Sequence, residues 1–290
     1  MTQNNITVCF IGGDARQRYA AEDLSKQINV NTFGAIFENI NRSSIRHFDS
    51  IQKALYDASA IILPLPAALV ERDISFVDLV AAAIKSNNTP YIIGGKFSPY
   101  LKDVMESYVI NSYDYCENEC FTLQNAFLTA EGAVDLAMKS TDKALRYSEC
   151  AVIGYGRIGK ALSEMLKHLG SDITVWARRD DALALARENK LKTEKIYDND
   201  GSFSKLSKGM DIIFNTVPER ILSNELLISI PQNTVLIELA SAPGGFDPDI
   251  AIQCELKFID GRGLPGKYAP MSAGRILSDT ILQHLKQRRN

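Results

Sequence analysis

The glycine-rich segment Gly154-Tyr155-Gly156-Arg157-Ile158-Gly159 has the residue types and the spacing of a phosphate-binding turn. A short apolar run, Cys150–Ile153, precedes it and predicts a buried strand, and the apolar residues that follow recur at helical spacing as far as Leu169. At this spacing the first glycine permits a tight turn, the second lets a pyrophosphate approach the backbone, and the third packs helix against strand. The helix N-terminus offers free N–H groups to a phosphate. We therefore predict a dinucleotide-binding turn in which all six residues of the segment contact the cofactor.

The next predicted strand, Asp172–Trp176, bears on which nicotinamide dinucleotide binds. An NAD site usually ends this strand with an acidic residue that accepts a hydrogen bond from the ribose 2′-hydroxyl. In this chain an alanine takes that place and two arginines follow, and a guanidinium can bind a 2′-phosphate through a fork of N–H donors. We predict NADP, with contacts from Trp176, Ala177, Arg178 and Arg179. The alternative is that both arginines are solvated turn residues beside the two aspartates that come next.

Two further loops are predicted to lie near the ribose and the nicotinamide. Ligands of an open parallel sheet collect at the carboxyl ends of the strands. The strands expected at 211–215 and 235–238 both lead into loops of small and polar residues, which suit close approach of the backbone to a ligand. The expected cofactor contacts are Asn215, Thr216, Val217, Pro218, Ala240 and Ser241, with Leu264 and Pro265 after the last strand, at 257–260. Ordinary loop chemistry is the alternative.

A second glycine pair lies near the N-terminus and favours carboxylate binding. The run Gly12-Gly13-Asp14-Ala15-Arg16 follows the predicted strand Thr7–Ile11 and opens a helix. A helix N-terminus beside an arginine is a natural receptor for a carboxylate. The expected substrate contacts are Gly13, Asp14 and Arg16, together with two cations beyond the last strand, Arg262 and Lys267. The alternative is that Asp14 only caps the helix and that Arg16 is a surface charge.

Few residues are placed to move a proton. The three histidines, His47, His168 and His284, lie in a polar connection or on predicted helices, and none is placed to pair with a carboxylate at a strand end. Glu131, near the expected start of a helix at Thr129, is the best-placed carboxylate and is our predicted catalytic residue. A favourable interaction with the helix dipole is the alternative for this glutamate. The five cysteines form no set with histidines that would predict a metal site.

The alternation of short apolar strands with helical stretches predicts an α/β fold with two doubly wound parallel sheets. At 290 residues the chain exceeds the usual size of one domain. We place a flavodoxin-like or Rossmann-like substrate-side domain at 1–128 and a Rossmann NADP-binding domain at 129–270. The amphipathic helix within 271–290 is expected to pack back on the first domain, with a cleft between the two domains. Other expected elements of the first domain are a strand ending at 36–37, a helix opened by Ser50, strands at 60–63 and 91–93, and a helix over 76–84.

Composition and charge narrow the class of protein. The formal net charge of −3, with no large basic block, argues against nucleic acid as a partner. No apolar run approaches the roughly 20 residues that a membrane span needs, and the polar N-terminus lacks the apolar core of a signal peptide. An odd number of cysteines, two of them in predicted strands, suits a reducing compartment. We predict a cytoplasmic homo-oligomer that binds neither nucleic acid nor membrane.

The chain resembles the family of dipicolinate synthase A subunits. The resemblance spans essentially the whole chain, and the opening Gly-Gly-Asp-Ala-Arg-Gln segment and the Gly-Leu-Pro-Gly segment are its more specific parts. It is carried by Ile11–Gln17, Thr129–Ala133, the glycine turn with its Ala177-Arg178 end, Asn215–Pro218, Leu239–Gly245, Gly263–Gly266, Ala269-Pro270 and Ala273–Leu277.

This resemblance implies an NADP-linked enzyme that oxidises dihydrodipicolinate, or its hydroxylated tetrahydro precursor, to dipicolinate during spore formation. It also implies a partner, the flavoprotein B subunit. Aromatisation of the pyridine ring drives such an oxidation, so that a weak base or water suffices, and a small pyridine-type dicarboxylate suits cationic receptors. Two alternatives remain: another NADP-dependent dehydrogenase of 2-hydroxy or 2-amino acids, and an NADP-binding subunit that is inactive without its partner.

Overall fold

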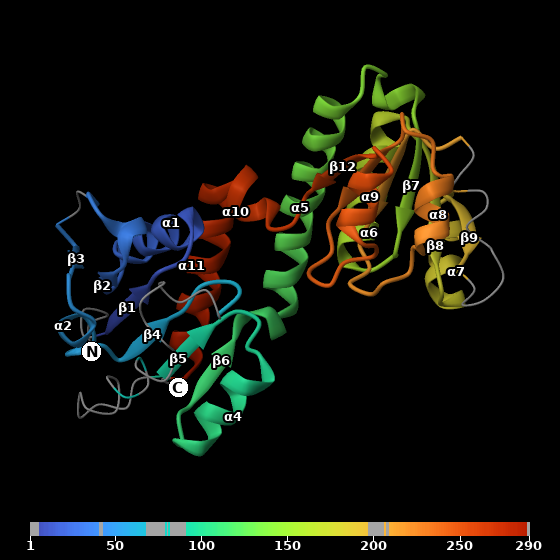
Figure 1. The fold of residues 1–290 in the computed structure, drawn as a ribbon. Helices are drawn as coiled ribbons and strands as arrows, with labels where there is room; N and C mark the ends of the chain where they lie inside the picture. Colours follow the sequence, from blue (N-terminus) through green and yellow to red (C-terminus); the bar gives the residue numbers. More distant parts are fainter. Residues whose placement is uncertain are drawn as a thin grey trace. The chain divides into compact units, whose positions relative to one another are not determined.

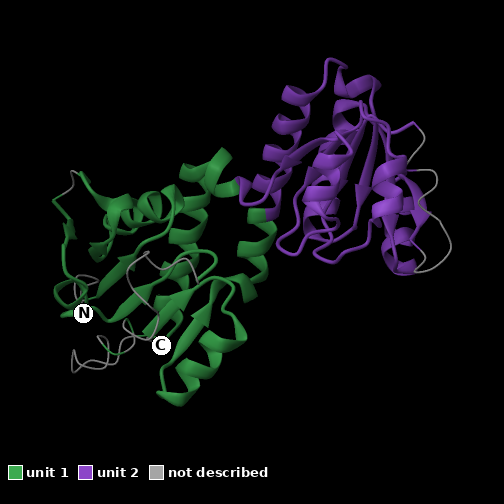
Figure 2. Ribbon diagram, viewed as in Figure 1, with its two compact units in different colours: residues 1–125, 265–290 green, residues 126–264 purple. Residues whose placement is uncertain are grey.

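The computed structural model describes residues 6–40, 43–67, 79, 81, 91–196, 206 and 209–288. The chain divides into two compact units (Figure 2). Unit 1 comprises Met1–Asn125 and Pro265–Asn290, and unit 2 comprises Ala126–Leu264. Compared with the domain limits expected from the sequence, residues 126–128 lie in unit 2 and residues 265–270 lie in unit 1.

Unit 1 contains a six-stranded parallel sheet with the strand order β3-β2-β1-β4-β5-β6 (Figure 1). The strands are β1 (Thr7–Ile11), β2 (Asn29–Phe33), β3 (Ile45–His47), β4 (Ala60–Ile62), β5 (Tyr91–Gly94) and β6 (Ser112–Asp114). The α-helices with described bounds are α1 (Ala15–Leu24), α2 (Ile51–Leu55), α4 (Pro99–Ser107) and α11 (Pro270–Gln287).

Unit 2 contains a second six-stranded parallel sheet, ordered β12-β11-β10-β7-β8-β9. Its strands are β7 (Glu149–Ile153), β8 (Asp172–Ala177), β9 (Lys192–Lys195), β10 (Ile212–Asn215), β11 (Val235–Glu238) and β12 (Lys257–Asp260). Its helices are α6 (Arg157–Leu169), α7 (Asp180–Glu188), α8 (Asn224–Ser229) and α9 (Pro248–Gln253), while α5 (Glu119–Ser140) and α10 (Leu264–Tyr268) contain the unit boundaries. Counted from each unit's first strand, both sheets have the order 3-2-1-4-5-6 of dinucleotide-binding folds.

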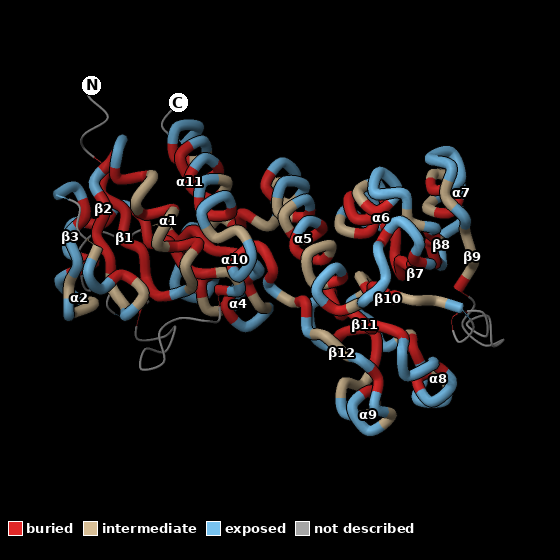
Figure 3. Tube along the Cα trace, turned by 90° about the horizontal axis from the view of Figure 1, so that it is seen from above, coloured by how far each residue is buried: buried red, intermediate tan, exposed pale blue. Residues whose placement is uncertain are grey.

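Each sheet is covered by helices on both faces, so that its central strands, such as β1, β10 and β11, are buried along their whole length (Figure 3). In unit 2, α5, α6 and α7 pack on one face and α8 and α9 on the other. In unit 1, α1 and α11 pack on one face and α2 and α4 on the other. The carboxyl ends of β1 and β4, and of β7 and β10, are the points at which the strand order reverses. These switch points are where open α/β sheets bind ligands.

Helix α11 packs along α1 through Leu277, Ile281 and Leu285. Near its end, His284 stacks on Tyr113 with ring centroids 3.7 Å apart, and its Nε2 lies 3.0 Å from the Tyr91 hydroxyl. These contacts tie the C-terminal helix to β5 and β6 of unit 1. Among the described residues, no helix combines the length and the apolarity needed to cross a membrane.

Several elements differ from the expectations. Helix α5 begins at Glu119, ten residues before the expected start at Thr129, because Asn118 Oδ1 accepts the Phe121 N–H at 2.9 Å and Phe121 packs in the unit 1 core. The expected strand end at 36–37 is a short 3-10 helix, since β2 ends at Phe33 before a glycine with φ +116°. Apart from Leu79 and position 81, the helix expected over 76–84 lies outside the described residues. Ser50 does precede a helix, α2.

Candidate functional site

In the turn between β7 and α6, a separate structural feature favours glycine at each of the three glycine positions. Gly154 has φ +93°, and a Cβ there would collide with Thr216 Oγ1 and lie 2.8 Å from Val217 Cγ2. A Cβ at Gly159 would collide with the carbonyl oxygen of Gly154, so this glycine lets α6 approach the strand end. A Cβ at Gly156 would meet nothing within 4 Å. Open space at the second glycine, beside a helix N-terminus, fits a pyrophosphate.

The first residues of α6 present their backbone to this space. Gly156 is the N-cap of α6, and no described side chain caps the helix there. Tyr155 is 7% exposed in the unit 2 core, where its hydroxyl accepts a hydrogen bond from Asn189 Nδ2 at 3.3 Å, and Ile158 packs against the same core. The Tyr155 side chain is therefore turned away from solvent, so that a contact between Tyr155 and a cofactor is through the backbone. The Ile158 side chain is partly buried.

At the end of β8, the structure separates the two arginines. The Arg178 guanidinium forms an ion pair with Glu219 of the loop after β10, with Nη2 2.8 Å from Oε2. Arg179 forms an ion pair with Asp181 and is exposed, as the alternative of a solvated turn residue describes. Trp176 is fully buried in the core below the turn, and its carbonyl accepts the Gly154 N–H at 2.8 Å. The indole therefore supports the turn and does not face a cofactor, contrary to the expectation for this residue.

The ends of β10 and β11 are joined by a buried carboxylate that sequence reasoning missed. Glu238, the last residue of β11, is 3% exposed and accepts hydrogen bonds from Asn215 Nδ2 at 2.7 and 3.0 Å. It also accepts the N–H groups of Ala240 at 2.7 Å and Gly245 at 2.8 Å. Burial raises the pKa of Glu238 above its ordinary value, while these donors and the charge of Arg262 act in the opposite direction. A glutamate ending an apolar strand, before a loop rich in small residues, was the available signal.

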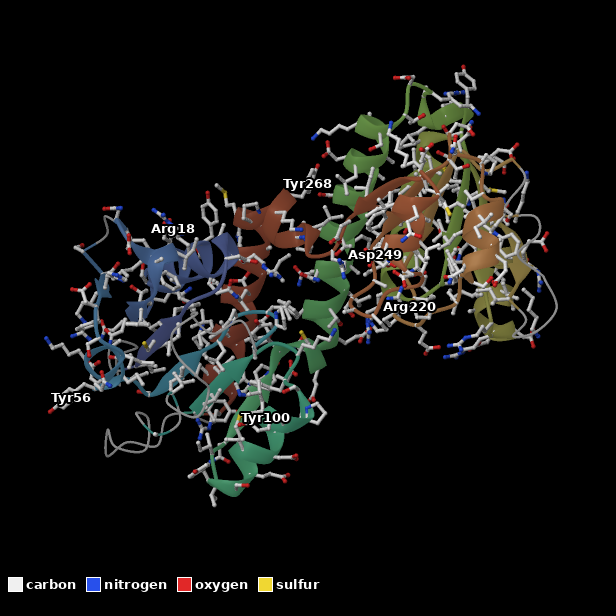
Figure 4. All side chains as sticks on the ribbon, in the orientation of Figure 1. Arg18, Tyr56, Tyr100, Arg220, Asp249 and Tyr268 are labelled. Atoms are coloured by element: carbon white, nitrogen blue, oxygen red, sulfur yellow. The ribbon has the colours of Figure 1, made fainter. Side chains whose placement is uncertain are left out.

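The other predicted residues at this edge of unit 2 are close to the strand ends. Thr216 Oγ1 donates to the carbonyl of Ile153 at 2.8 Å, so the loop after β10 is fixed to the end of β7. Pro218 and Ser241 are exposed, and so is Arg220, which is labelled in Figure 4. Leu264 is buried against Gly132 of α5, so its side chain belongs to the core and cannot face a cofactor.

In unit 1, an aspartate side chain of the protein itself lies at the helix N-terminus in the turn between β1 and α1. Asp14 is the N-cap and accepts the Arg16 N–H at 2.9 Å, and Gln17 Oε1 accepts the Asp14 N–H at 3.1 Å. This reciprocal pair is a capping box. Gly13 has φ +105°, and a Cβ there would lie 2.8 Å from the Gln17 side chain. Asp14 therefore does cap the helix, as one alternative stated.

Arg16 is not a surface charge, so that part of the same alternative is wrong. The residue is 7% exposed, with Nη2 2.8 Å from Asp14 Oδ2 and Nε 3.1 Å from Oδ1. Nη2 also donates to the carbonyl of Leu65 after β4, at 3.2 Å. Burial alone would lower the pKa of Arg16, but the hydrogen bonds and charge of Asp14 raise it above its ordinary value. Arg16 thus bridges the ends of β1 and β4 at the switch point of unit 1.

The remaining predicted residues have less specific surroundings. Arg262 pairs with Asp260, at 2.8 Å from Nε to Oδ1 and 2.6 Å from Nη2 to Oδ2, and Lys267 is exposed in α10. Glu131 is exposed in the middle of α5, so the expected position in a first helical turn is wrong. The structure gives Glu131 no special partner among the described residues.

The histidines are engaged away from carboxylates. His47 Nδ1 lies 3.1 Å from Thr32 Oγ1, and His168 Nδ1 lies 2.8 Å from the carbonyl of Glu164 in its own helix. His284 is held in the stack with Tyr91 and Tyr113. Within the described part of the chain, no histidine is hydrogen-bonded to an aspartate or glutamate side chain.

The chain matches two protein-family models. Residues 7–116 match the N-terminal domain of the dipicolinate synthase A subunit, and residues 124–243 match the NAD-binding domain of D-isomer specific 2-hydroxyacid dehydrogenases. A dehydrogenase-type domain with this glycine turn belongs to an oxidoreductase that depends on a nicotinamide dinucleotide.

Known proteins match along the full length. The chain is 29% identical over 303 aligned residues to the dipicolinate synthase A subunit of Bacillus subtilis strain 168, covering 97% of this chain and 96% of the relative. A crystal structure of the dipicolinate synthase A subunit from Bacillus halodurans matches with a TM-score of 0.85 at 26% identity, over 98% of this chain and 99% of that one. The crystal structure of the corresponding Bacillus subtilis protein matches with a TM-score of 0.84 at 27% identity, over 100% and 99%. Along its whole length, the chain is therefore similar to the A subunits of dipicolinate synthase, in sequence and in fold.

Proposed function

We propose that this chain is an NADP-dependent dehydrogenase that produces dipicolinate in spore formation, working with a flavoprotein partner. Its substrate is dihydrodipicolinate or the hydroxylated tetrahydro precursor, which must also lose water. The observations that carry the proposal are the similarity to dipicolinate synthase A subunits along the whole chain and the open turn at Gly156. In the reaction, one hydride and one proton leave the ring, and the ring becomes aromatic. When bound, NADP supplies the acceptor for the hydride.

The proposed cofactor contacts lie at the carboxyl edge of the unit 2 sheet. The N-terminus of α6 holds the pyrophosphate, and the loops after β10 and β11 hold the nicotinamide half. Arg178 binds the 2′-phosphate. Two observations support NADP over NAD: β8 ends in Ala177 without a carboxylate, and the adjoining arginine lies within 2.8 Å of an exposed glutamate that a phosphate can displace.

The proposed substrate contacts lie in unit 1. Asp14 and Leu65 engage Nε and Nη2 of Arg16, and no described residue accepts a hydrogen bond from its Nη1, which can therefore donate to a substrate carboxylate. The exposed ammonium of Lys267 is the second proposed cation, and Gly13 leaves the backbone accessible beside Asp14. Arg262 is a weaker candidate than expected, because Asp260 already occupies its guanidinium.

Removal of the proton needs only a weak acceptor, because aromatisation supplies the driving force. This suits a chain in which no described histidine pairs with a carboxylate. Glu131 or a water molecule is the proposed acceptor. The same lack of a histidine–carboxylate pair argues against a 2-hydroxy acid dehydrogenase of the common type, in which that pair takes the alcohol proton.

The test is reduction of NADP by the purified chain when dihydrodipicolinate is supplied. We expect NADPH and dipicolinate to form in equal amounts, and no turnover of a panel of 2-hydroxy and 2-amino acids. Activity that appears only when the flavoprotein is added would make the chain a binding subunit. Turnover of a 2-hydroxy or 2-amino acid without turnover of dihydrodipicolinate would contradict the proposal.

A further inference from the structure

We propose that Glu238 is a positioning residue for the nicotinamide half of the cofactor, and that it acts as a carboxylate anion. It fixes two loops at the carboxyl edge of unit 2, the β10 loop (residues 215–218) and the β11 loop (residues 240–245). The inference rests on the proposed function, in which these loops hold the nicotinamide and its ribose.

The hydrogen bonds converge on Glu238 from both loops. Its Oε1 accepts from Asn215 Nδ2 and the Ala240 N–H, both at 2.7 Å. Its Oε2 accepts from the Gly245 N–H at 2.8 Å and from Asn215 Nδ2 at 3.0 Å. The Asn215 side chain also spans its own loop, since Nδ2 donates to the Val217 carbonyl at 2.9 Å and Oδ1 accepts the Val217 N–H at 3.2 Å. One carboxylate therefore sets the shape of both loops.

The packing leaves the β10 and β11 loops no room to shift toward the buried Glu238–Asn215 pair. A Cβ at Gly244 would lie 2.8 Å from Glu238 Oε2, and one at Gly245 would collide with the amide of Asn215. The Gly245 carbonyl accepts the N–H groups of Ile221 and Leu222, each at 2.9 Å, which ties the β11 loop to the chain beyond the β10 loop. The backbone of the β11 loop thus lies directly against the buried Glu238–Asn215 pair.

The hydrogen-bond partners of Glu238 require its side chain to be a carboxylate anion. The hydrogen bonds that Asn215, Ala240 and Gly245 make to the Glu238 carboxylate all come from N–H donors, and a proton on either oxygen would face one of them. The facing charge is Arg262 of the segment after β12, itself paired with Asp260. Burial raises the pKa of Glu238 above its ordinary value. Since the anion is present above the shifted pKa, loop order is complete at high pH and is lost as pH falls through that value.

Glu238 acts through the loops and is too deeply buried to touch the cofactor itself. A purely structural role would weaken every ligand of unit 2 alike. A positioning role for the nicotinamide half weakens NADP binding but spares adenosine 2′-monophosphate, which contains only the adenosine and its 2′-phosphate. The 2′-phosphate is the one phosphate monoester in both ligands and titrates alike in both, so the ratio of the two affinities isolates the loops.

The experiment is calorimetric titration of the full chain with NADP and with adenosine 2′-monophosphate, from about pH 8 to about pH 5. For Glu238→Gln, which turns an amide donor toward one of the backbone N–H groups, we expect NADP to bind about tenfold more weakly and the monophosphate to bind unchanged. In the wild type, the affinity for NADP divided by that for the monophosphate falls toward acid pH, and in the variant this ratio does not fall. Glu188→Gln, an exposed glutamate of α7 in the same unit, is the matched control and behaves as wild type.

The titrations distinguish failure of the proposed function from failure of the inference about Glu238. Wild-type protein that binds neither NADP nor adenosine 2′-monophosphate overturns the proposed function, and this inference with it. Wild-type protein that binds both, with Glu238→Gln equal to it in affinity ratio, overturns this inference alone. Where Glu238→Gln does not fold, Glu238→Asp keeps the charge, and the wild-type pH profile decides without any variant: an affinity ratio that is flat toward acid pH overturns the inference.

Discussion

The two units share a strand order but end their first strands in different turns. In unit 2, α6 begins at Gly156 with open space where a side chain would be. In unit 1, α1 begins at Asp14, whose carboxylate occupies the helix N-terminus and is matched by the buried Arg16. An anion at a helix N-terminus is favourable whether it comes from a ligand or from the chain itself. Unit 1 therefore carries its own anion at the place that unit 2 leaves for a phosphate.

This difference shows that topology alone does not make a dinucleotide site. Both sheets bring a βα turn to their switch point, yet the residue at the N-cap decides whether the helix N–H groups are available. In unit 1 the guanidinium of Arg16 replaces the helix N-terminus as the cationic group at the edge. In our proposal, the same scaffold therefore binds a phosphate in one unit and a carboxylate in the other.

The most severe way to break the comparison is Gly156→Asp, which gives unit 2 the N-cap of unit 1. Gly156 has φ −81° and ψ −160°, extended values that aspartate adopts, and its Cβ would meet no neighbour. We expect NADP affinity to fall at least about 100-fold, roughly 3 kcal/mol, because the new carboxylate repels the pyrophosphate and takes its N–H donors. Calorimetric titration measures the affinity, and urea unfolding should show stability unchanged or slightly raised. Retained NADP binding would show that the pyrophosphate does not use this helix end.

The reverse change, Asp14→Ala, removes the internal anion of unit 1. We expect the free energy of unfolding to fall by about 2 kcal/mol, because the helix loses its cap and the buried guanidinium of Arg16 loses its carboxylate. Asp247→Ala, which removes the N-cap of α9 in unit 2, is the matched control and should cost about 1 kcal/mol. Urea unfolding compares the two variants. Equal losses would mean that the Arg16 pair adds nothing beyond a cap.

A smaller effect is expected from Arg178→Ala at the end of β8. NADP should bind about tenfold more weakly, because the 2′-phosphate loses a charged fork of donors, while NAD binds as before. Arg179→Ala is the matched control, since its partner Asp181 lies next to it in the turn, and should leave both affinities unchanged. Glu219→Gln, which frees Arg178 from an exposed ion pair, should strengthen NADP binding about twofold. NAD and NADP affinities that stay equal in all three variants would remove the argument for the 2′-phosphate.

Strands with an apolar centre were predictable, and short strands with a polar sequence were not. The limits of β1, β11 and β12 are those expected, and β1 and β12 each run directly into a glycine, Gly12 and Gly261. Strands β3, β6 and β9 were not expected, since they are short, carry polar residues and lie toward the sheet edges. Helix α5 was placed too late because Thr129 and Glu131 resemble a helix start, whereas the Asn118 side chain already accepts the Phe121 N–H in the first turn of the helix.

Local spacing along the sequence was enough to predict the α/β class, the glycine turn and the missing carboxylate after β8, because glycine conformation and strand–helix periodicity depend on neighbouring residues. Tertiary structure decided the rest. It buried Trp176 and Tyr155, paired Arg178 with Glu219, and joined Glu238 to Asn215 across 23 positions of sequence. Burial and partner choice depend on which strand ends meet at one edge of a sheet. Crossover connections bring those ends together, and no local pattern records that.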